Sequence, residues 1–339
     1  MLIAIVYSCL IVSAFFHSCV SWETNCDEKQ RILSGHFRFG DWSRLPTEHL
    51  TTLRYRIQSN VYAVSEQGPS CYQSAHNIGL SYYWSSPTRV QRILARHLDH
   101  TLHKNTIGIS SPAQLCHLIS GRNILIVGDS INFQFYASLI QFLWNKKDTN
   151  ISTTVDSQYR KFSHGHSTII HCNENSHSFA IHFIRNYGLW LNTKDDSTDG
   201  MYYYPWVNEI SKRNISILIL NRGAHYTPNH ILLNDLNNTF HYLNENVIHN
   251  VTVIWRDTPH GHAGCKANFK DPPMDKDHVI PVAVLPLRHW EEFHLQNRLV
   301  ENLLKLHYSW IYYMHVYTMT VRRADSHKLK PDRGLYFIL

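Results

Sequence analysis

The sequence predicts an α/β fold, a sheet of mostly parallel strands with helices on both faces, preceded by an irregular N-terminal extension. From Cys116 onward, short β-branched apolar runs alternate with stretches whose apolar residues recur at helical spacing. In addition, residues 123–127 (NILIV) form a short apolar run that is typical of a strand buried in the middle of a parallel sheet.

The predicted elements follow from these patterns in chain order. The strand at 123–127 ends in Gly128-Asp129-Ser130, and a helix over 131–144 follows, with Asp129 or Ser130 available as its cap. Further strands are predicted over 168–171, 178–184, 215–220 and 250–255, and a further helix over 291–307.

The residues before this domain divide into two parts. We predict that residues 1–21 form a secretory signal peptide, because their apolar run is shorter than the roughly 20 residues that span a bilayer. The missing basic n-region leaves an uncleaved anchor as the alternative. We predict that residues 22–115 form an extension with one helix over 87–103. Residues 116–339 are predicted to form the main domain.

Composition narrows the class of protein. The formal net charge of +6 is mildly basic, and the absence of a long Lys/Arg run argues against a nucleic-acid partner. N-x-[ST] acceptor sequons agree with the secretory route, and they begin at Asn150, Asn214, Asn237 and Asn250.

The cysteines also indicate an oxidising compartment. Of the seven, Cys9 and Cys19 would leave with the signal peptide, so five would remain, widely spaced and without a C-x-x-C pair. We therefore expect disulfides, with one cysteine left over. The sequence leaves their connectivity open.

Ser130 is the predicted nucleophile. It stands where a central strand ends and a helix begins, at the sheet edge where open α/β folds bind their ligands. Its backbone N–H lies at the helix N-terminus, where the helix dipole favours a developing oxyanion. The triplet alone is a weak signal, because such a turn is more often ordinary helix capping.

Four segments occur along the chain in this order: ILIVGDSINFQFYASL, LILNRGAHY, VTVIWRDTPHGHAGC and YTMTVRRADSH. Together they resemble the successive blocks of PC-esterase proteins, which include the plant trichome-birefringence-like glycan O-acetyltransferases. The resemblance covers residues 116–331. It implies an SGNH (GDSL) fold, acyl transfer through the motif serine, and carbohydrate hydroxyls as the substrate class.

Residue by residue, the resemblance implies the following roles. Ser130 matches the nucleophile, and Asn221 and Gly223 would complete an oxyanion hole with the Ser130 N–H. Phe133 departs from the family, which commonly has Arg there. Side chains of the implied substrate cleft are Gln134, His225, Arg256 and His262. The alternative for Asn221 is a loop cap after its strand.

Two His-Gly-His pairs, at 164–166 and 260–262, invite a metal interpretation. Their spacing is not that of a helical i, i+4 pair, and no carboxylate or thiolate cluster accompanies them. We therefore predict no metal site and no cofactor.

The general base is where the chain departs most from the family, whose D-x-x-H motif lies near the C-terminus. Here the chain ends KLKPDRGLYFIL, and with Asp332 at the motif aspartate, Leu335 takes the histidine position. Asp325 and His327 form a shortened D-x-H pair that would have to act instead. The odd cysteine count and this ending together predict a final segment that was lost or replaced.

These observations predict a carbohydrate O-acyltransferase that moves an acetyl group from an unidentified acyl donor to a glycan hydroxyl. The alternatives are a carbohydrate acetyl esterase and an inactive secreted glycoprotein that only binds glycan. We expect no stable membrane span and a location in the Golgi lumen or outside the cell.

Overall fold

The described part of the chain is built round one seven-stranded sheet. The computed structural model describes residues 41–44, 82–85, 112–119, 121–143, 149–154, 165–172, 178–191, 196–198, 201–223, 225–247, 250–260 and 289–321. The predicted signal peptide and the helix expected over 87–103 lie outside these residues.

The sheet is mixed, with a parallel majority. Its strands are β3 (Asn123–Gly128), β4 (Thr149–Thr154), β5 (Gly165–Cys172), β6 (Ser178–Arg185), β9 (Ile215–Leu220), β10 (Thr252–Arg256) and β11 (Tyr312–Met314). Their spatial order is β11-β10-β9-β3-β6-β5-β4. The first five in this order run parallel, β5 is antiparallel to β6, and β4 is antiparallel to β5. The predicted α/β class and mostly parallel sheet are confirmed.

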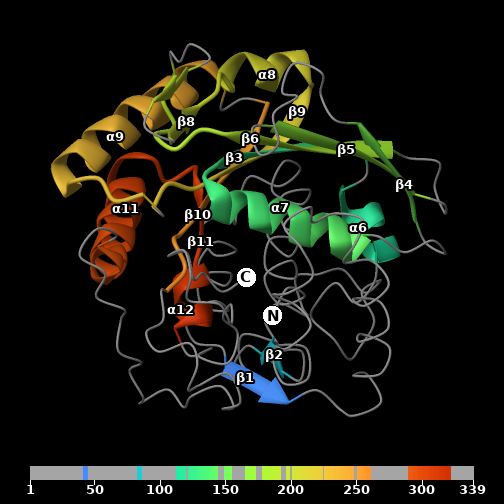
Figure 1. Cartoon of the computed structure of the whole chain (residues 1–339), viewed down its shortest axis with the longest axis horizontal. Coiled ribbons are helices and arrows are strands. Elements are labelled where there is room, and N and C mark those ends of the chain that lie inside the picture. Colours follow the sequence, from blue (N-terminus) through green and yellow to red (C-terminus); the bar gives the residue numbers. More distant parts are fainter. Residues whose placement is uncertain are drawn as a thin grey trace, which may run out of the picture.

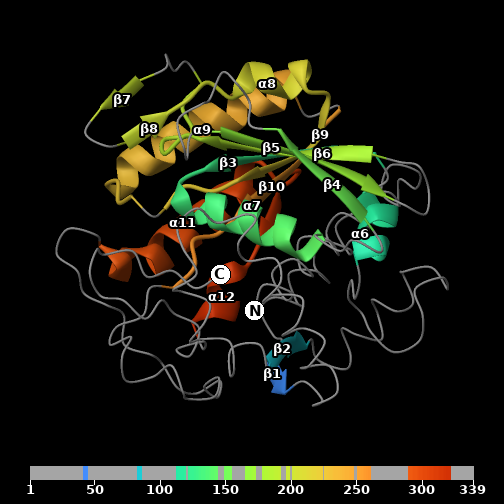
Figure 2. The ribbon, with the colours of Figure 1, turned by 45° about the vertical axis from the view of Figure 1, so that its right-hand side comes forward.

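Helices cover both faces of the sheet. They are α6 (Pro112–Ile119), α7 (Ser130–Leu143), α8 (Val207–Lys212), α9 (Asn229–Asn246), α11 (Phe293–His307, preceded by the 3-10 turn η4 at Trp290–Glu292) and α12 (Val316–Thr320). Figures 1 and 2 show α7 on the opposite side of the sheet from α8 and α9. Alternate residues of β3 therefore enter two different packing layers. Leu125 and Val127 join a core cluster to which α8, α9 and α11 contribute.

Helix α9 is an element that the sequence prediction omitted. Its buried residues recur at helical spacing and are Leu232, Leu236, Thr239, Phe240 and Leu243. The signal was therefore present in the sequence, although the many Asn and His residues between these positions make the apolar stripe narrow and easy to overlook.

Two short antiparallel pairs accompany the main sheet. Strands β1 (Asp41–Arg44) and β2 (Tyr82–Ser85) pair within the predicted N-terminal extension, so two described stretches of it are regular. Strands β7 (Asp196–Thr198) and β8 (Met201–Tyr203) form the other pair.

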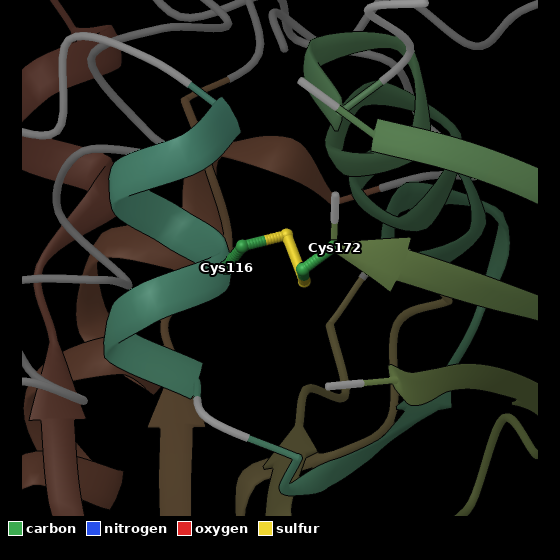
Figure 3. Close-up of a disulfide and its surroundings, with 2 residues drawn as sticks. All are labelled: Cys116 and Cys172. Atoms are coloured by element: carbon green, nitrogen blue, oxygen red, sulfur yellow. A yellow bond between two sulfur atoms is a disulfide. The ribbon is translucent and has the colours of Figure 1, made fainter. Parts of the chain in front are cut away.

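A disulfide joins α6 to the sheet. Cys116 on α6 bonds to Cys172 at the end of β5, with their Cα atoms 5.8 Å apart (Figure 3). This confirms that the chain carries a disulfide, and it supplies one pairing that the sequence left open. The predicted boundary between residues 115 and 116 falls inside α6.

The order of the strands defines the edge where a ligand would bind. From β3 the chain proceeds to β6 on one side and then to β9 on the other, so the direction of winding reverses at β3. In open α/β sheets the crevice outside the carboxyl ends of the strands at such a reversal is the usual ligand site. Ser130 follows β3 at this point.

Candidate active site

The Gly128-Asp129-Ser130 turn joins β3 to α7. Asp129 is the helix cap, because its Oδ1 accepts the Ile131 N–H at 2.8 Å and its carbonyl oxygen accepts the Phe133 N–H at 3.0 Å. Ser130 is then the first helical residue and is half-buried. Its N–H belongs to the first turn of the helix, where the donors have no intrahelical acceptor. The predicted position of Ser130 is confirmed.

Close packing around the turn requires glycine at position 128. A Cβ placed on Gly128 would lie 2.6 Å from Asn132 Nδ2 and 2.7 Å from the Asn221 carbonyl oxygen. Asn221 also donates its backbone N–H to the Val127 carbonyl at 3.3 Å. The end of β9 therefore lies directly beside the serine turn, as the sequence predicted.

Arg256 and Asn221 form a buried network behind this turn. Arg256 donates Nε–H to Asn132 Oδ1 at 2.9 Å, and its guanidinium lies 5.6 Å from the centre of the Phe135 ring. Asn221 Nδ2 donates to the Arg256 carbonyl at 2.9 Å and to Thr258 Oγ1 at 3.2 Å. Both Asn221 amide hydrogens thus have acceptors within the protein, and donation to an oxyanion would require one of them to exchange.

Arg256, which the resemblance implies to lie in the substrate cleft, is buried in this structure. Arg256 is 0% exposed, so in this conformation it does not line an accessible surface. Its side chain links the end of β10 to the first turn of α7 through Asn132. Gly223 has a similar packing role, because a Cβ there would lie 1.8 Å from Thr258 Oγ1.

His225 reaches across the end of β3. Its ring stacks on Tyr187 with centroids 4.1 Å apart and planes at 16°. Tyr187 follows β6 and His225 follows β9, and these two strands flank β3, so their contact spans the carboxyl end of β3. Burial raises the pKa of Tyr187, and the charge of Asp129 adds to this while that of Arg185 opposes it. The Tyr187 hydroxyl therefore lies within electrostatic reach of both side chains.

This chain matches no family model, and no curated protein or solved structure is significantly similar to it.

Arg185 is an unusual residue beside the turn. It pairs with Gly128 at the end of β6 and is 7% exposed. Its contacts are a 3.5 Å hydrogen bond from Nη1 to the Tyr187 hydroxyl and the ring faces of Tyr187 and Tyr202, at 5.8 and 5.5 Å. Among the described residues no carboxylate forms a salt bridge with it, and its enclosed Nε–H has no acceptor.

The energetics of Arg185 are unfavourable in this state. Cation–π contacts contribute about 0.5–2 kcal/mol each. Desolvating a guanidinium costs several kcal/mol, on the order of 3–5 kcal/mol when the charge lacks a partner. Arg222 follows β9, on the other side of β3. Its charge is paired, because Asp235 Oδ2 lies 2.9 Å from its Nη1.

The ends of β10 and β11 hold a second buried polar group. Asp257 Oδ1 accepts the Val316 and Tyr317 N–H groups at 2.6 and 2.8 Å, which anchors the start of α12. Burial raises the pKa of Asp257 to about 8. His260 Nδ1 lies 2.9 Å from the Tyr317 hydroxyl, and burial lowers the pKa of His260 to about 4. His260 is therefore a neutral residue that packs against α12.

The other predicted site residues fall outside what the structure describes. Asp325, His327 and His262 lie in the ranges 261–288 and 322–339, and the side chain of Gln134 is likewise not described. Within the described ranges, no group of three or more His, Cys, Asp or Glu residues is arranged to hold a metal ion.

The described sequons lie on exposed positions. Asn214 and Asn250 precede β9 and β10, at the amino edge of the sheet and therefore opposite Ser130. Asn237 is exposed on α9, where its Oδ1 accepts the Tyr308 hydroxyl at 2.9 Å. Asn150 lies in β4, and its side chain is not described. Glycans at Asn214 and Asn250 would leave the serine edge open.

Sequence reasoning overlooked Arg185 and Tyr187. The signal available was the segment IRNYG, in which polar residues follow the apolar run of β6 as Asp129 and Ser130 follow that of β3. In a parallel sheet, residues that follow neighbouring strands meet at one edge.

Proposed function

We propose that the chain is a carbohydrate O-acyltransferase that carries an acetyl group on Ser130. The observation that supports this most directly is the position of Ser130, at the first residue of α7 and at the reversal of the sheet. The PC-esterase resemblance of the sequence blocks supports the same reaction class and suggests the SGNH fold.

In this proposal Ser130 Oγ attacks the carbonyl carbon of an acyl donor while a base removes the hydroxyl proton. The tetrahedral oxyanion would accept hydrogen bonds from N–H groups at the start of α7. The tetrahedral intermediate then collapses, and the donor's leaving group departs with the proton that the base took from Ser130. A sugar hydroxyl then attacks the acyl-serine, which yields the O-acylated sugar and restores Ser130.

The base in this proposal is a histidine, and two positions can supply it. The shortened pair Asp325 and His327 lies outside the described residues. His225 is the imidazole that the structure places across the end of β3, through its stack on Tyr187. Both histidines are therefore candidates for the proton transfer.

A second candidate function is an inactive, glycan-binding secreted protein. The observation that favours it is the Asn221 amide, whose two hydrogens are already donated to Arg256 and Thr258. In that case the serine turn would persist for its role in packing. The disulfide between Cys116 and Cys172 is compatible with the secretory pathway in either case.

Hydrolysis of a chromogenic acetyl ester by the purified chain tests the acyl-transfer reaction. We expect Ser130→Ala to lose the activity, and either His327→Ala or His225→Ala to lose on the order of 10²- to 10⁴-fold in rate. Ser211→Ala and His241→Ala, at exposed positions on α8 and α9, serve as matched controls and should leave the rate unchanged.

Three outcomes separate the candidates. Formation of an acetylated sugar, detected by mass when a glycan is added, identifies a transferase. Release of acetate without sugar product identifies the esterase alternative. Equal background rates in wild type and Ser130→Ala would exclude catalysis by Ser130 and favour the inactive glycoprotein.

A further inference from the structure

The buried guanidinium of Arg185 has a position and an environment that the proposed reaction does not explain. It lies at the end of β6, in register with Gly128 of the serine turn. Its side chain is 7% exposed, and among the described residues it has no carboxylate partner. Buried charges in proteins are ordinarily paired, so one without a partner requires an explanation.

Neighbouring charges do not supply that partner. Asp129 acts on the same Tyr187 hydroxyl as Arg185, but its Oδ1 accepts the Ile131 N–H, and it forms no salt bridge with the guanidinium. Asp235 is engaged by Arg222 Nη1 at 2.9 Å and by Trp190 Nε1 at 3.2 Å.

The surroundings of Arg185 fit an oxyanion that presents two acceptor oxygens side by side. Tyr187 and Tyr202 present their ring faces to the guanidinium and restrict its movement, and the Tyr187 hydroxyl accepts a hydrogen bond from Nη1. No described residue accepts a hydrogen bond from Nη2. A guanidinium held in this way offers paired N–H donors to a carboxylate or another oxyanion, and less of its rotamer entropy remains to be lost on binding.

We propose that Arg185 is an anion-binding residue that receives the oxyanion of an acidic sugar whose hydroxyl is presented to Ser130. The inference rests on the proposed function for the sugar and for its orientation, and it narrows the substrate class from carbohydrate to acidic carbohydrate. The oxyanion can be the carboxylate of a uronic acid or the sulfate of a sulfated sugar, since both match the same donor pair.

Calorimetric titration tests binding without any turnover. The probes are D-glucuronate, its neutral methyl ester, and glucose 6-sulfate. We expect wild type to bind at least one of the two anions, and to bind glucuronate at least 10-fold more tightly than the methyl ester if the carboxylate is the natural group. Stronger binding of glucose 6-sulfate than of glucuronate would identify sulfate as the natural group instead.

The variants connect this binding to one side chain. Arg185→Met should weaken binding of the anion roughly 10- to 100-fold and leave the affinity for the methyl ester unchanged. Arg298→Met removes the same charge from an exposed position on α11 and should match wild type. Arg185→Lys, which keeps the charge but loses the planar fork, should fall between them.

Thermal unfolding of the ligand-free proteins provides an independent readout. Because Arg185→Met removes a buried charge without a partner, its midpoint should equal or exceed that of wild type, whereas a purely structural arginine would lower it when replaced. Anion affinity that is absent in wild type, or that is equal in wild type and Arg185→Met, would overturn the proposal. Ser130→Ala should bind the anion normally. Anion binding by wild type together with equal ester hydrolysis by wild type and Ser130→Ala would refute only the proposed reaction.

Discussion

Removing the disulfide between Cys116 and Cys172 tests the fold where α6 is bonded to the sheet. The bond closes a loop with a sequence separation of 56. We consider the double variant Cys116→Ala/Cys172→Ala, because both sulfur atoms are buried and alanine leaves no reactive thiol.

The magnitude follows from the loop length. In the chain-entropy description, the unfolded chain recovers about 14 cal/mol/K when a loop of about 56 residues is opened, which corresponds to about 4 kcal/mol at 25 °C. The truncated sulfur atoms add a smaller packing loss, since each side chain is mostly enclosed. This sum is a large fraction of the 5–15 kcal/mol that is typical of whole domains.

Urea unfolding followed by circular dichroism measures the effect. We expect the free energy of unfolding to fall by about 4 kcal/mol in the double variant, and wild type in reducing agent to show a similar loss. Reducing agent added to the double variant reveals whether other cysteines contribute. Superimposable curves for the oxidised wild type and the double variant would refute the reasoning, because they would mean that the bond does not form or does not restrict the unfolded chain.

Three further predictions concern the serine edge. Gly223→Ala should destabilise the fold by about 1–3 kcal/mol in chemical denaturation, because its Cβ would overlap Thr258 Oγ1, and an unchanged midpoint would contradict this. Arg256→Met should lower stability by about 3 kcal/mol, since the buried Asn132 Oδ1 loses its donor; thermal melts that match wild type would argue against the network. Burial raises the pKa of Asp257 from 3.8 to about 8, so the folded state binds this proton more tightly than the unfolded chain. The resulting stabilisation is complete below pH 4 and is lost as the pH rises toward 8. Asp257→Asn should therefore show a shallower fall of unfolding free energy between pH 4 and 8, and parallel profiles would count against it.

Within the described residues, no helix has both the length and the apolar character needed to cross a bilayer. The secretory location remains a prediction. Intact-mass analysis of secreted protein would test it, through a mature chain that begins near residue 22 and carries N-glycans.

The sequence by itself determined the elements whose signals are local. The central strand before Gly128, the helix after it and the strand over 215–220 follow from apolar runs and from the break at the glycine. The position of Ser130 could be predicted for the same reason, because a strand that leads into a helix places its junction at a sheet edge. Helix α9 could have been found from the spacing of its leucines.

Only the tertiary structure decided which of these ends meet. The pairing of β3 with both β6 and β9 joins segments far apart in the chain, and a strand's own residues do not specify its neighbours. The partner of Cys116, the burial of Arg256 and the stack of His225 on Tyr187 all depend on that pairing. The environment of Arg185 depends on the same pairing. The sequence shows that this residue is charged, but only the elements that pack around it decide how far the charge is removed from water.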